Sequence, residues 1–305
     1  MSLDLSGLPT SPHLSYVMEG DAPAALITLP NARAKISFVG AHVMSFETRD
    51  GNGWREQLWL PPLARPMRGK AMRGGIPLCW PWFGPHKTDK SLPQHGVARI
   101  ALWDVINATD GATDNAGAYQ SIAFNLPPSA MAGVPGLDPQ AVTLRCLITV
   151  HDDGELHLAL TTIGLAGFTF SEAFHTYFRV ADVRQVAVHG LDGGTYRDQA
   201  DNNLMKDLSG PFDFSREVNA HFPHRGGPQT IVDPAGQRTI RIETSNAQGT
   251  TVWHPGPEAP QKFAEIPAAV AHQFVCVESG NLPENPVMFT ETTVHEVVVR
   301  YAFRR

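Results

Sequence analysis

The chain has 305 residues, and 24 Lys and Arg against 30 Asp and Glu give it a formal net charge of -6. This acidic balance argues against a nucleic-acid partner, because nucleic acids select proteins with a basic face. No apolar stretch approaches the roughly 18 residues that a membrane-spanning helix requires, and residues 1–13 lack the basic start and apolar stretch of a secretory signal. We therefore expect a soluble, cytoplasmic protein with no membrane partner.

The sequence contains no signal for a domain boundary. Its 25 Pro and 27 Gly are spread along its length, and no charge run or low-complexity stretch separates one half from the other. A chain of this length can form one large domain or two smaller ones, so the missing linker favours one. We predict a single domain over residues 1–305, in which residues 1–20 form a peripheral N-terminal segment.

Short runs of β-branched and aromatic residues between turn residues recur along the chain, and each is typical of a strand. In chain order the expected strands, besides one hairpin described next, are residues 25–29, 35–39, 42–47, 57–60, 103–107, 122–126, 185–189, 239–243, 251–254, 274–278 and 294–301.

The clearest local pattern spans residues 142–163, where apolar and polar residues alternate on both sides of an Asp153-Gly154 turn. This pattern predicts a β-hairpin with one buried face. Helical signals are limited to residues 129–132 and 262–271, which are short and interrupted or flanked by proline. Many short strands joined by Gly/Pro turns predict an all-β fold, a large antiparallel β-sandwich with few short helices.

Residues 73–83 read Arg-Gly-Gly-Ile-Pro-Leu-Cys-Trp-Pro-Trp-Phe, which is typical of a ligand-binding loop. The glycines permit a close backbone approach, the prolines fix φ, and aromatic residues such as Trp82 offer flat apolar faces. Arg73 adds a planar cation that pairs with carboxylate or phosphate through two hydrogen bonds. The alternative is a loop that plugs a β-sheet core and carries a surface arginine.

The neighbourhood of this loop reverses the overall sign of the charge. Between Glu56 and Asp89 there is no acidic residue, whereas five cationic residues occur there: Arg65, Arg68, Lys70, Arg73 and Lys87. A small anion with apolar faces, such as a sugar phosphate, is therefore the favoured partner.

Two further segments place imidazoles among groups that could bind or transfer protons. Gln94, His95 and Arg99 offer an amide, an imidazole and a guanidinium within six residues, the mixture that hydroxyl and phosphate recognition uses. In residues 172–178, strand alternation puts His175 on one face with an aromatic neighbour, where burial could tune it for general acid/base work. Either histidine could instead be a hydrogen-bonded structural residue.

The segment 274–280 ends an apolar strand on Glu278, followed by a turn. A carboxylate at a strand end that faces a cleft could act as a general base. It could equally be the first solvated residue after the strand, and the spacing alone does not choose between the two.

Motifs for several other chemistries are absent from the sequence. There is no Gly-x-Gly-x-x-Gly, Walker loop, nucleophile elbow or His-Glu-x-x-His. The pair His221 and His224 is too small for a metal site. Cys79, Cys146 and Cys276 lack CxxC spacing, so we expect reduced, packed thiols. We predict no metal site.

Four motifs taken together resemble the glucose-6-phosphate 1-epimerases, the hexose-6-phosphate mutarotase branch of the aldose 1-epimerase family. They are Arg-Gly-Gly-Ile-Pro-Leu-Cys-Trp-Pro-Trp-Phe-Gly at 73–84, Gln-His-Gly-x-Ala-Arg at 94–99, Phe-His-Thr-Tyr-Phe at 174–178 and Cys-Val-Glu at 276–278. The resemblance implies a monomeric, galactose mutarotase-like supersandwich. It also implies action on the anomeric carbon of a phosphorylated aldohexose, without a metal or organic cofactor.

The resemblance also assigns roles to residues of this chain. His175 and Glu278 match the catalytic histidine and glutamate of the family, and His95 matches a second active-site histidine of related galactose mutarotases. Three further residues match ligand-binding positions: Arg73, Gln94 and Arg99. Asn219 falls where the family usually has a ligand-binding aspartate, and the loss of its charge affects a hydroxyl contact.

The residues and the resemblance lead to one predicted reaction. Glu278 takes the proton of the C1 hydroxyl and His175 protonates the ring oxygen, so that the ring opens, C1 rotates and the ring closes on the other face. Arg73 and Arg99 hold the phosphate, and the aromatic loop with Trp82 packs against the sugar ring. Three alternatives remain: a mutarotase of unphosphorylated aldoses, a noncatalytic sugar-binding module, and a β-sandwich interaction domain.

Overall fold

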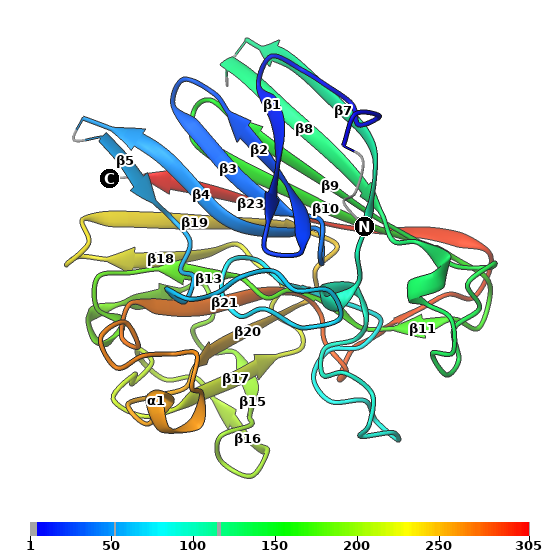
Figure 1. Ribbon diagram of the computed structural model, residues 1–305. Helices are drawn as coiled ribbons and strands as arrows, with labels where there is room; N and C mark the ends of the chain where they lie inside the picture. Colours follow the sequence, from blue (N-terminus) through cyan, green and yellow to red (C-terminus); the bar gives the residue numbers. More distant parts are fainter. Residues whose placement is uncertain (1–4, 52, 115–116, 305) are drawn as a thin grey trace.

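The computed structural model describes residues 5–51, 53–114 and 117–304 (Figure 1). Antiparallel strands make up nearly half of this part of the chain and dominate its regular structure. The helical elements described are the short helix α1 (Ala259–Lys262) and three single-turn 3-10 helices: η1 (Ala98–Ile100), η2 (Pro128–Ala130) and η3 (Val183–Gln185). The expectation of an all-β, antiparallel fold with few short helices is confirmed.

The N-terminal part forms a five-stranded sheet in sequential order. Its strands are β1 (Leu14–Glu19), β2 (Ala22–Thr28), β3 (Ala32–Ser37), β4 (His42–Asp50) and β5 (Gly53–Glu56). Residues 1–20 were expected to be peripheral. Residues 1–4 lie outside the described part, and β1 is an edge strand that pairs with β2 along its whole length.

A second sheet has eight strands in the order β14-β18-β19-β23-β10-β9-β8-β7. Their bounds are β7 (Asp104–Thr113), β8 (Gly117–Asn125), β9 (Thr143–His151), β10 (Glu155–Gly164), β14 (Ala187–His189), β18 (Gln229–Asp233), β19 (Arg238–Ser245) and β23 (Thr293–Arg304). Strands β9 and β10 confirm the predicted hairpin over residues 142–163.

A third sheet carries the polar cavity described below. It runs in the order β16-β15-β17-β20-β21-β12-β6, and β13 also pairs with β21. Its strands are β6 (Leu78–Cys79), β12 (Glu172–Phe174), β13 (Tyr177–Arg179), β15 (Thr195–Asp198), β16 (Leu204–Asp207), β17 (Val218–Phe222), β20 (Gly249–His254) and β21 (Phe274–Asn281). Strands β11 (Thr169–Phe170) and β22 (Val287–Met288) form a separate small ladder.

The sheets pack on one hydrophobic cluster to which all three contribute. Strand β9 shows why: Leu144, Cys146 and Ile148 are fully buried, while the residues between them face outward. Strand β9 contacts β3, whose Ile36 is also fully buried. Each buried aliphatic side chain stabilises the fold by roughly 1.5–3 kcal/mol. The three cysteines are free and buried, as expected.

Three expected elements differ from the structure. Residues 57–60 lie after β5 and contribute only an isolated bridge at Leu58. The predicted helix over 262–271 is wrong: α1 ends at Lys262, since Phe263 has an extended backbone, and Pro267 would interrupt a helix over this range. Strand β21 continues past Glu278 to Asn281, so Glu278 stands within a strand instead of at its end.

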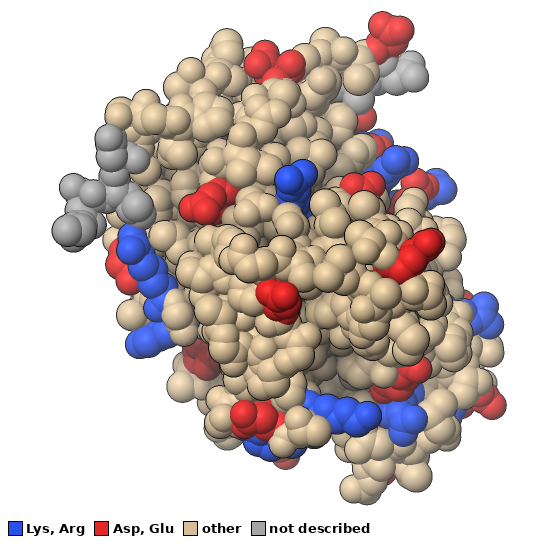
Figure 2. All heavy atoms as spheres, turned by 90° about the vertical axis from the view of Figure 1, so that its right-hand side faces the viewer, with Lys and Arg blue, Asp and Glu red and all other residues tan. Residues whose placement is uncertain are grey.

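The sequence patterns missed β15 to β18, of which β17 lines part of the cavity. The face in Figure 2 shows basic and acidic side chains interspersed, without a continuous basic strip among the described residues. In the part of the chain that the structure describes, no helix is both long and apolar enough to cross a bilayer.

Candidate active site

A cavity of about 520 Å³ opens over the third sheet. This volume is within the range of small-molecule sites, about 300–1,000 Å³. All predicted site residues except Trp82 line it: Arg73, Gln94, His95, Arg99, His175, Asn219 and Glu278. The fold thus brings together side chains from segments that are far apart in the sequence.

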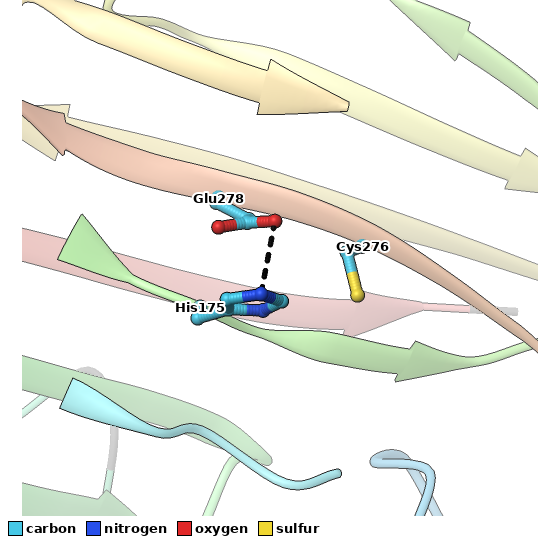
Figure 3. A group of neighbouring side chains, drawn as sticks. All are labelled: His175, Cys276 and Glu278. Atoms are coloured by element: carbon cyan, nitrogen blue, oxygen red, sulfur yellow. Dashed lines mark ion pairs between the residues drawn. The ribbon is translucent and has the colours of Figure 1, made fainter. Parts of the chain in front are cut away.

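His175 and Glu278 face each other at the floor of the cavity (Figure 3). Nε2 of His175 lies 3.4 Å from Oε1 of Glu278, and the two side chains are 8% and 1% exposed. Glu278 is held within β21. His175 stands in the break between β12 and β13, where its backbone N–H donates to the carbonyl of Pro77. Its ring stacks on Tyr177 at 4.9 Å.

Burial shifts the two proton affinities in opposite directions. It raises the pKa of Glu278 well above the ordinary value, and nearby Arg99 opposes this only in part. It lowers the pKa of His175 well below the ordinary value, and the charges of His95, Arg99 and Arg73 lower it further. A carboxylate with a raised pKa is a stronger base, and an imidazolium with a lowered pKa is a stronger acid. The environment therefore suits proton exchange between these groups and a ligand.

The loop start that carries Arg73 is fixed by its glycines. Gly74 and Gly75 have φ values of 89° and 60°, and a Cβ on Gly75 would meet the carbonyl oxygen of Val43 at 2.2 Å. Nε2 of His42 donates to the Gly74 carbonyl at 2.7 Å, and burial lowers the pKa of His42 to about 3. A neutral, buried imidazole thus anchors the loop at this point.

The Arg73 guanidinium is held by several groups at once. Its Nε donates to Oε1 of Glu265 at 2.9 Å and its Nη1 to the Tyr177 hydroxyl at 3.1 Å. It stacks over the Phe263 ring at 4.3 Å and lies 5.4 Å from the Trp253 ring. In the described part of the chain no hydrogen bond engages Nη2, which leaves this nitrogen for a ligand in the cavity.

Arg99 provides a second cation from the single turn of η1. It is 8% exposed, and its Nη2 donates to the carbonyl of Met72 at 3.1 Å. Its Nε is buried without a hydrogen-bond partner among the described residues. A buried guanidinium with an unused donor is a ready partner for an anionic ligand.

His95 has a fixed protonation pattern. Its Nδ1 accepts the backbone N–H of Gly84 at 3.1 Å, so the neutral ring carries its proton on Nε2. Burial lowers the pKa of His95 well below the ordinary value, with further lowering by the charge of Arg99. The neighbouring Gly96 is required, because a Cβ there would lie 2.0 Å from the Trp80 carbonyl oxygen. His95 therefore presents a hydrogen-bond donor.

The aromatic walls differ from those expected. Trp82 does not line the cavity, because its Nε1 donates to the Pro93 carbonyl at 3.0 Å and its ring packs against the core cluster. The neighbour Phe83 lines the cavity instead. Three further aromatic rings join it: Tyr177, which is the aromatic neighbour expected beside His175, and with it Trp253 and Phe263.

Strand β17 contributes a row of polar side chains. Asn219 and His221 lie two positions apart and therefore share one face of β17. Glu217 directly precedes the strand, and all three residues line the cavity. Asn219 was predicted. Glu217 and His221 were not, although polar and apolar residues alternate through residues 217–222, a signal that could have found this strand. His254, at the end of β20, instead bonds the Ala271 carbonyl at 2.9 Å outside the cavity.

His175, Cys276 and Glu278 offer three metal-ligand atoms within 4.8 Å of one another (Figure 3). Cys276 is fully buried among apolar side chains, and burial raises the pKa of its thiol well above the ordinary value. A metal requires the thiolate, which this environment disfavours. The set therefore fits proton transfer better than metal binding.

The arrangement of antiparallel sheets is that of the galactose mutarotase-like class of folds. A galactose mutarotase-like protein from Lactobacillus casei superposes with a TM-score of 0.66 at 15% identity, over 92% of this chain and 100% of that chain. The chain belongs to the aldose 1-epimerase family, whose sequence model matches residues 25–301. Membership supports a sugar mutarotase activity.

Individual relatives cover nearly the whole chain. The Escherichia coli protein named "Putative glucose-6-phosphate 1-epimerase" is 29% identical over 288 residues, which are 93% of this chain and 92% of that protein. A Cenchrus ciliaris protein of the same name is 26% identical over 84% of this chain and 77% of its own length. The Salmonella typhimurium protein described as "a putative mutarotase" has a TM-score of 0.85 at 26% identity, over 98% and 96% of the two chains.

Proposed function

We propose that the protein interconverts the α and β anomers of a hexose 6-phosphate, with glucose 6-phosphate as the preferred substrate. The observation that carries this proposal is the common cavity, in which the buried His175–Glu278 pair lies together with the guanidinium groups of Arg73 and Arg99. The names of the relatives support the same substrate class.

The proposed reaction moves two protons and needs no redox change or group transfer. The carboxylate of Glu278 takes the proton of the C1 hydroxyl, while the imidazolium of His175 gives its proton to the ring oxygen. The bond between C1 and the ring oxygen breaks, and C1 becomes an aldehyde carbon. After rotation about the C1–C2 bond, the reverse transfers close the ring on the other face. The His175–Glu278 pair therefore carries one proton before the sugar ring opens, on His175, and one proton after it has opened, on Glu278.

The two arginines account for the phosphate in this proposal. Nη2 of Arg73 and Nε of Arg99 have no hydrogen-bond partner among the described residues, and the bond from a guanidinium to a phosphate is charge-assisted. Binding the phosphate away from C1 would orient the anomeric carbon between Glu278 and His175. A mutarotase of unphosphorylated aldoses would have little use for these cations.

Magnetisation-exchange NMR of the anomers tests the proposal. We expect the protein to accelerate anomer exchange of glucose 6-phosphate more than that of glucose, with galactose 6-phosphate as a second phosphorylated probe. Faster exchange of glucose would favour the unphosphorylated-sugar alternative. No acceleration for any of the three sugars would leave a noncatalytic sugar-binding module.

The Arg73→Gln variant tests the phosphate contact separately. Loss of a charge-assisted hydrogen bond costs about 1.5–3 kcal/mol, so KM for glucose 6-phosphate should rise about 10- to 100-fold. The KM for glucose should change little. An equal rise for both sugars would place Arg73 elsewhere than at the phosphate.

A further inference from the structure

Three side chains on neighbouring strands of the third sheet lie directly beside one another. His221 of β17 pairs with Thr251 of β20, and Thr251 pairs with Glu278 of β21. All three line the cavity, so they form a row on the same face of the sheet. Neighbouring strands are about 4.8 Å apart, which places His221 about 10 Å from Glu278 across the row. A sugar whose C1 lies at Glu278 and whose ring spans this row would bring a ring hydroxyl close to His221.

Two members of the row have a buried polar atom without a hydrogen-bond partner among the described residues. They are Oγ1 of Thr251 and Oε2 of Glu278, in residues that are each 1% exposed. Buried polar groups are nearly always hydrogen-bonded, and a cavity that leaves several of them unpaired is suited to a ligand rich in hydroxyl groups.

The His221 ring is held from two sides. Its Nδ1 lies 3.5 Å from Oε1 of Glu284, and Nε of Arg197 lies 3.3 Å from the same oxygen. The ring of Phe83 meets it edge to face at 5.5 Å. Burial acts to raise the pKa of Glu284, but contact with His221 and the charge of Arg197 bring it below the ordinary value. Glu284 is therefore an anionic acceptor for the Nδ1 proton.

This contact sets which nitrogen of His221 is free for a ligand. When the ring carries a single proton and that proton is on Nδ1, the other nitrogen, Nε2, is an acceptor. His95 shows the opposite pattern, because its Nδ1 accepts a backbone N–H and its Nε2 donates. Both rings meet Phe83, His95 at 5.0 Å and His221 at 5.5 Å. The cavity thus combines one imidazole donor and one imidazole acceptor on either side of an aromatic ring.

We propose that Nε2 of His221 accepts a hydrogen bond from the sugar hydroxyl at C3 or C4, and that Glu284 is the positioning residue that fixes the required tautomer. This inference rests on the proposed function, which places C1 at Glu278. His221 is then a specificity-determining residue for the sugar, distinct from the proton-transferring pair and from the arginines.

The variant His221→Phe tests this proposal, because it keeps a ring against Phe83 but removes the acceptor. Calorimetry measures the binding of glucose 6-phosphate and of its 3-deoxy and 4-deoxy analogues, and exchange NMR measures the interconversion of their anomers. Loss of one neutral hydrogen bond predicts about three- to tenfold weaker binding and lower kcat/KM for glucose 6-phosphate. For the deoxy analogue that lacks the contacted hydroxyl, His221→Phe and wild type should bind equally well. The matched control is His224→Phe, an exposed position three residues along that does not line the cavity, and it should behave as wild type.

Glu284→Gln tests the positioning role. Side-chain ¹⁵N NMR should find the His221 proton on Nδ1 in the wild type and a mixture of tautomers in this variant. In the His221→Phe background the Glu284→Gln change should cost nothing further, because the two residues act through one contact. An unchanged tautomer would overturn the role of Glu284.

The outcomes separate this inference from the proposed function. If the wild type binds glucose 6-phosphate without exchanging its anomers, the proposed function fails, and the binding series still decides the role of His221. If His221→Phe binds glucose 6-phosphate as tightly as wild type, or if its deficit persists with both deoxy analogues, the hydroxyl contact is wrong. A wild type that binds none of these sugars would overturn both.

Discussion

Nε2 of His175 lies 3.4 Å from Oε1 of Glu278, and burial disfavours the charged form of each. The two groups therefore titrate as a pair, and the apparent pKa values belong to the pair. In the proposed reaction the active form carries one proton, whether as an ion pair or as a neutral acid and imidazole. The range of pH over which that form persists becomes a measurable property of the site.

We predict a bell-shaped pH profile of kcat with a broad plateau. The pair gains its second proton only well below pH 6.5, because the pKa of His175 is lowered. It loses its last proton well above pH 4.5, because the pKa of Glu278 is raised. Activity should fall outside these limits. Since the substrate phosphate itself titrates near pH 6, the profile with glucose is the control. If kcat with both sugars fell on the acid side with a midpoint at pH 6.5, the lowered pKa of His175 would be contradicted.

We predict that Glu278→Gln lowers kcat about 10²- to 10⁴-fold, the usual contribution of a general base, with little change in the Kd of glucose 6-phosphate. The melting temperature should equal or exceed that of wild type, because the variant removes a carboxyl group buried without a full set of partners. Exchange NMR, calorimetry and thermal unfolding measure the three quantities.

The control for Glu278→Gln is Glu172→Gln. Glu172 is also a fully buried carboxyl group beside an imidazole, since its Oε1 lies 2.7 Å from Nε2 of His295, but it does not line the cavity. This variant should keep the exchange rate. A wild-type rate in Glu278→Gln would remove the base from the mechanism and favour a sugar-binding module.

We predict that Glu265→Gln lowers KM for glucose 6-phosphate about two- to fivefold, since an exposed ion pair contributes about 0.2–1 kcal/mol. Glu265 pairs with Arg73 at 2.9 Å and is half exposed, so its charge competes with a phosphate for the same guanidinium. Tyr177 and Phe263 still hold Arg73 in the variant. Steady-state exchange kinetics at low and high salt measure the effect.

Two comparisons control the Glu265 result. The KM for glucose should not change, because glucose lacks the competing charge. Glu258→Gln removes another exposed carboxylate nearby, which pairs with Lys262 at 3.5 Å, and should leave both KM values unchanged. A higher KM for glucose 6-phosphate in Glu265→Gln would mean that Glu265 supports the binding geometry instead of opposing the phosphate.

The sequence predicted those parts of the fold and site that local chemistry specifies. Alternation along residues 142–163 marked the β9–β10 hairpin, and polar residues within apolar or aromatic runs marked His175 and Glu278. Contacts between distant segments have no such local signal. Arg73 and Glu265 are 192 positions apart, so their pairing could not be read from spacing.

The same limit explains the aromatic walls and the β17 row. A Gly/Pro loop indicates that some of its aromatic residues meet a ligand, but backbone direction decides that Phe83 lines the cavity while Trp82 turns to Pro93. Polar and apolar residues alternate through residues 217–222, but this alternation does not show what the polar face meets, so His221 looked like half of a weak metal motif. Only the pairing with β20 reveals its place beside Thr251.

We predict that His42 makes the fold sensitive to acid. Its pKa is about 3 in the folded protein, because the ring is fully buried, against about 6.5 in the unfolded chain. Below pH 6.5 His42 binds a proton in the unfolded chain but stays neutral in the folded protein. The free energy of unfolding therefore falls by about 1.4 kcal/mol per pH unit, which is about 2 kcal/mol at pH 5. Above pH 6.5 this effect is absent.

Urea unfolding of wild type and His42→Gln at pH 7 and pH 5 isolates this contribution, because the other titrating groups cancel in the difference. Gln keeps an amide donor for the Gly74 carbonyl but does not titrate. The loss of unfolding free energy between pH 7 and pH 5 should be about 2 kcal/mol smaller in the variant. His189→Gln, at an exposed position, should lose as much as wild type. Equal losses in wild type and His42→Gln would show that His42 is not the group through which acid destabilises the loop anchor.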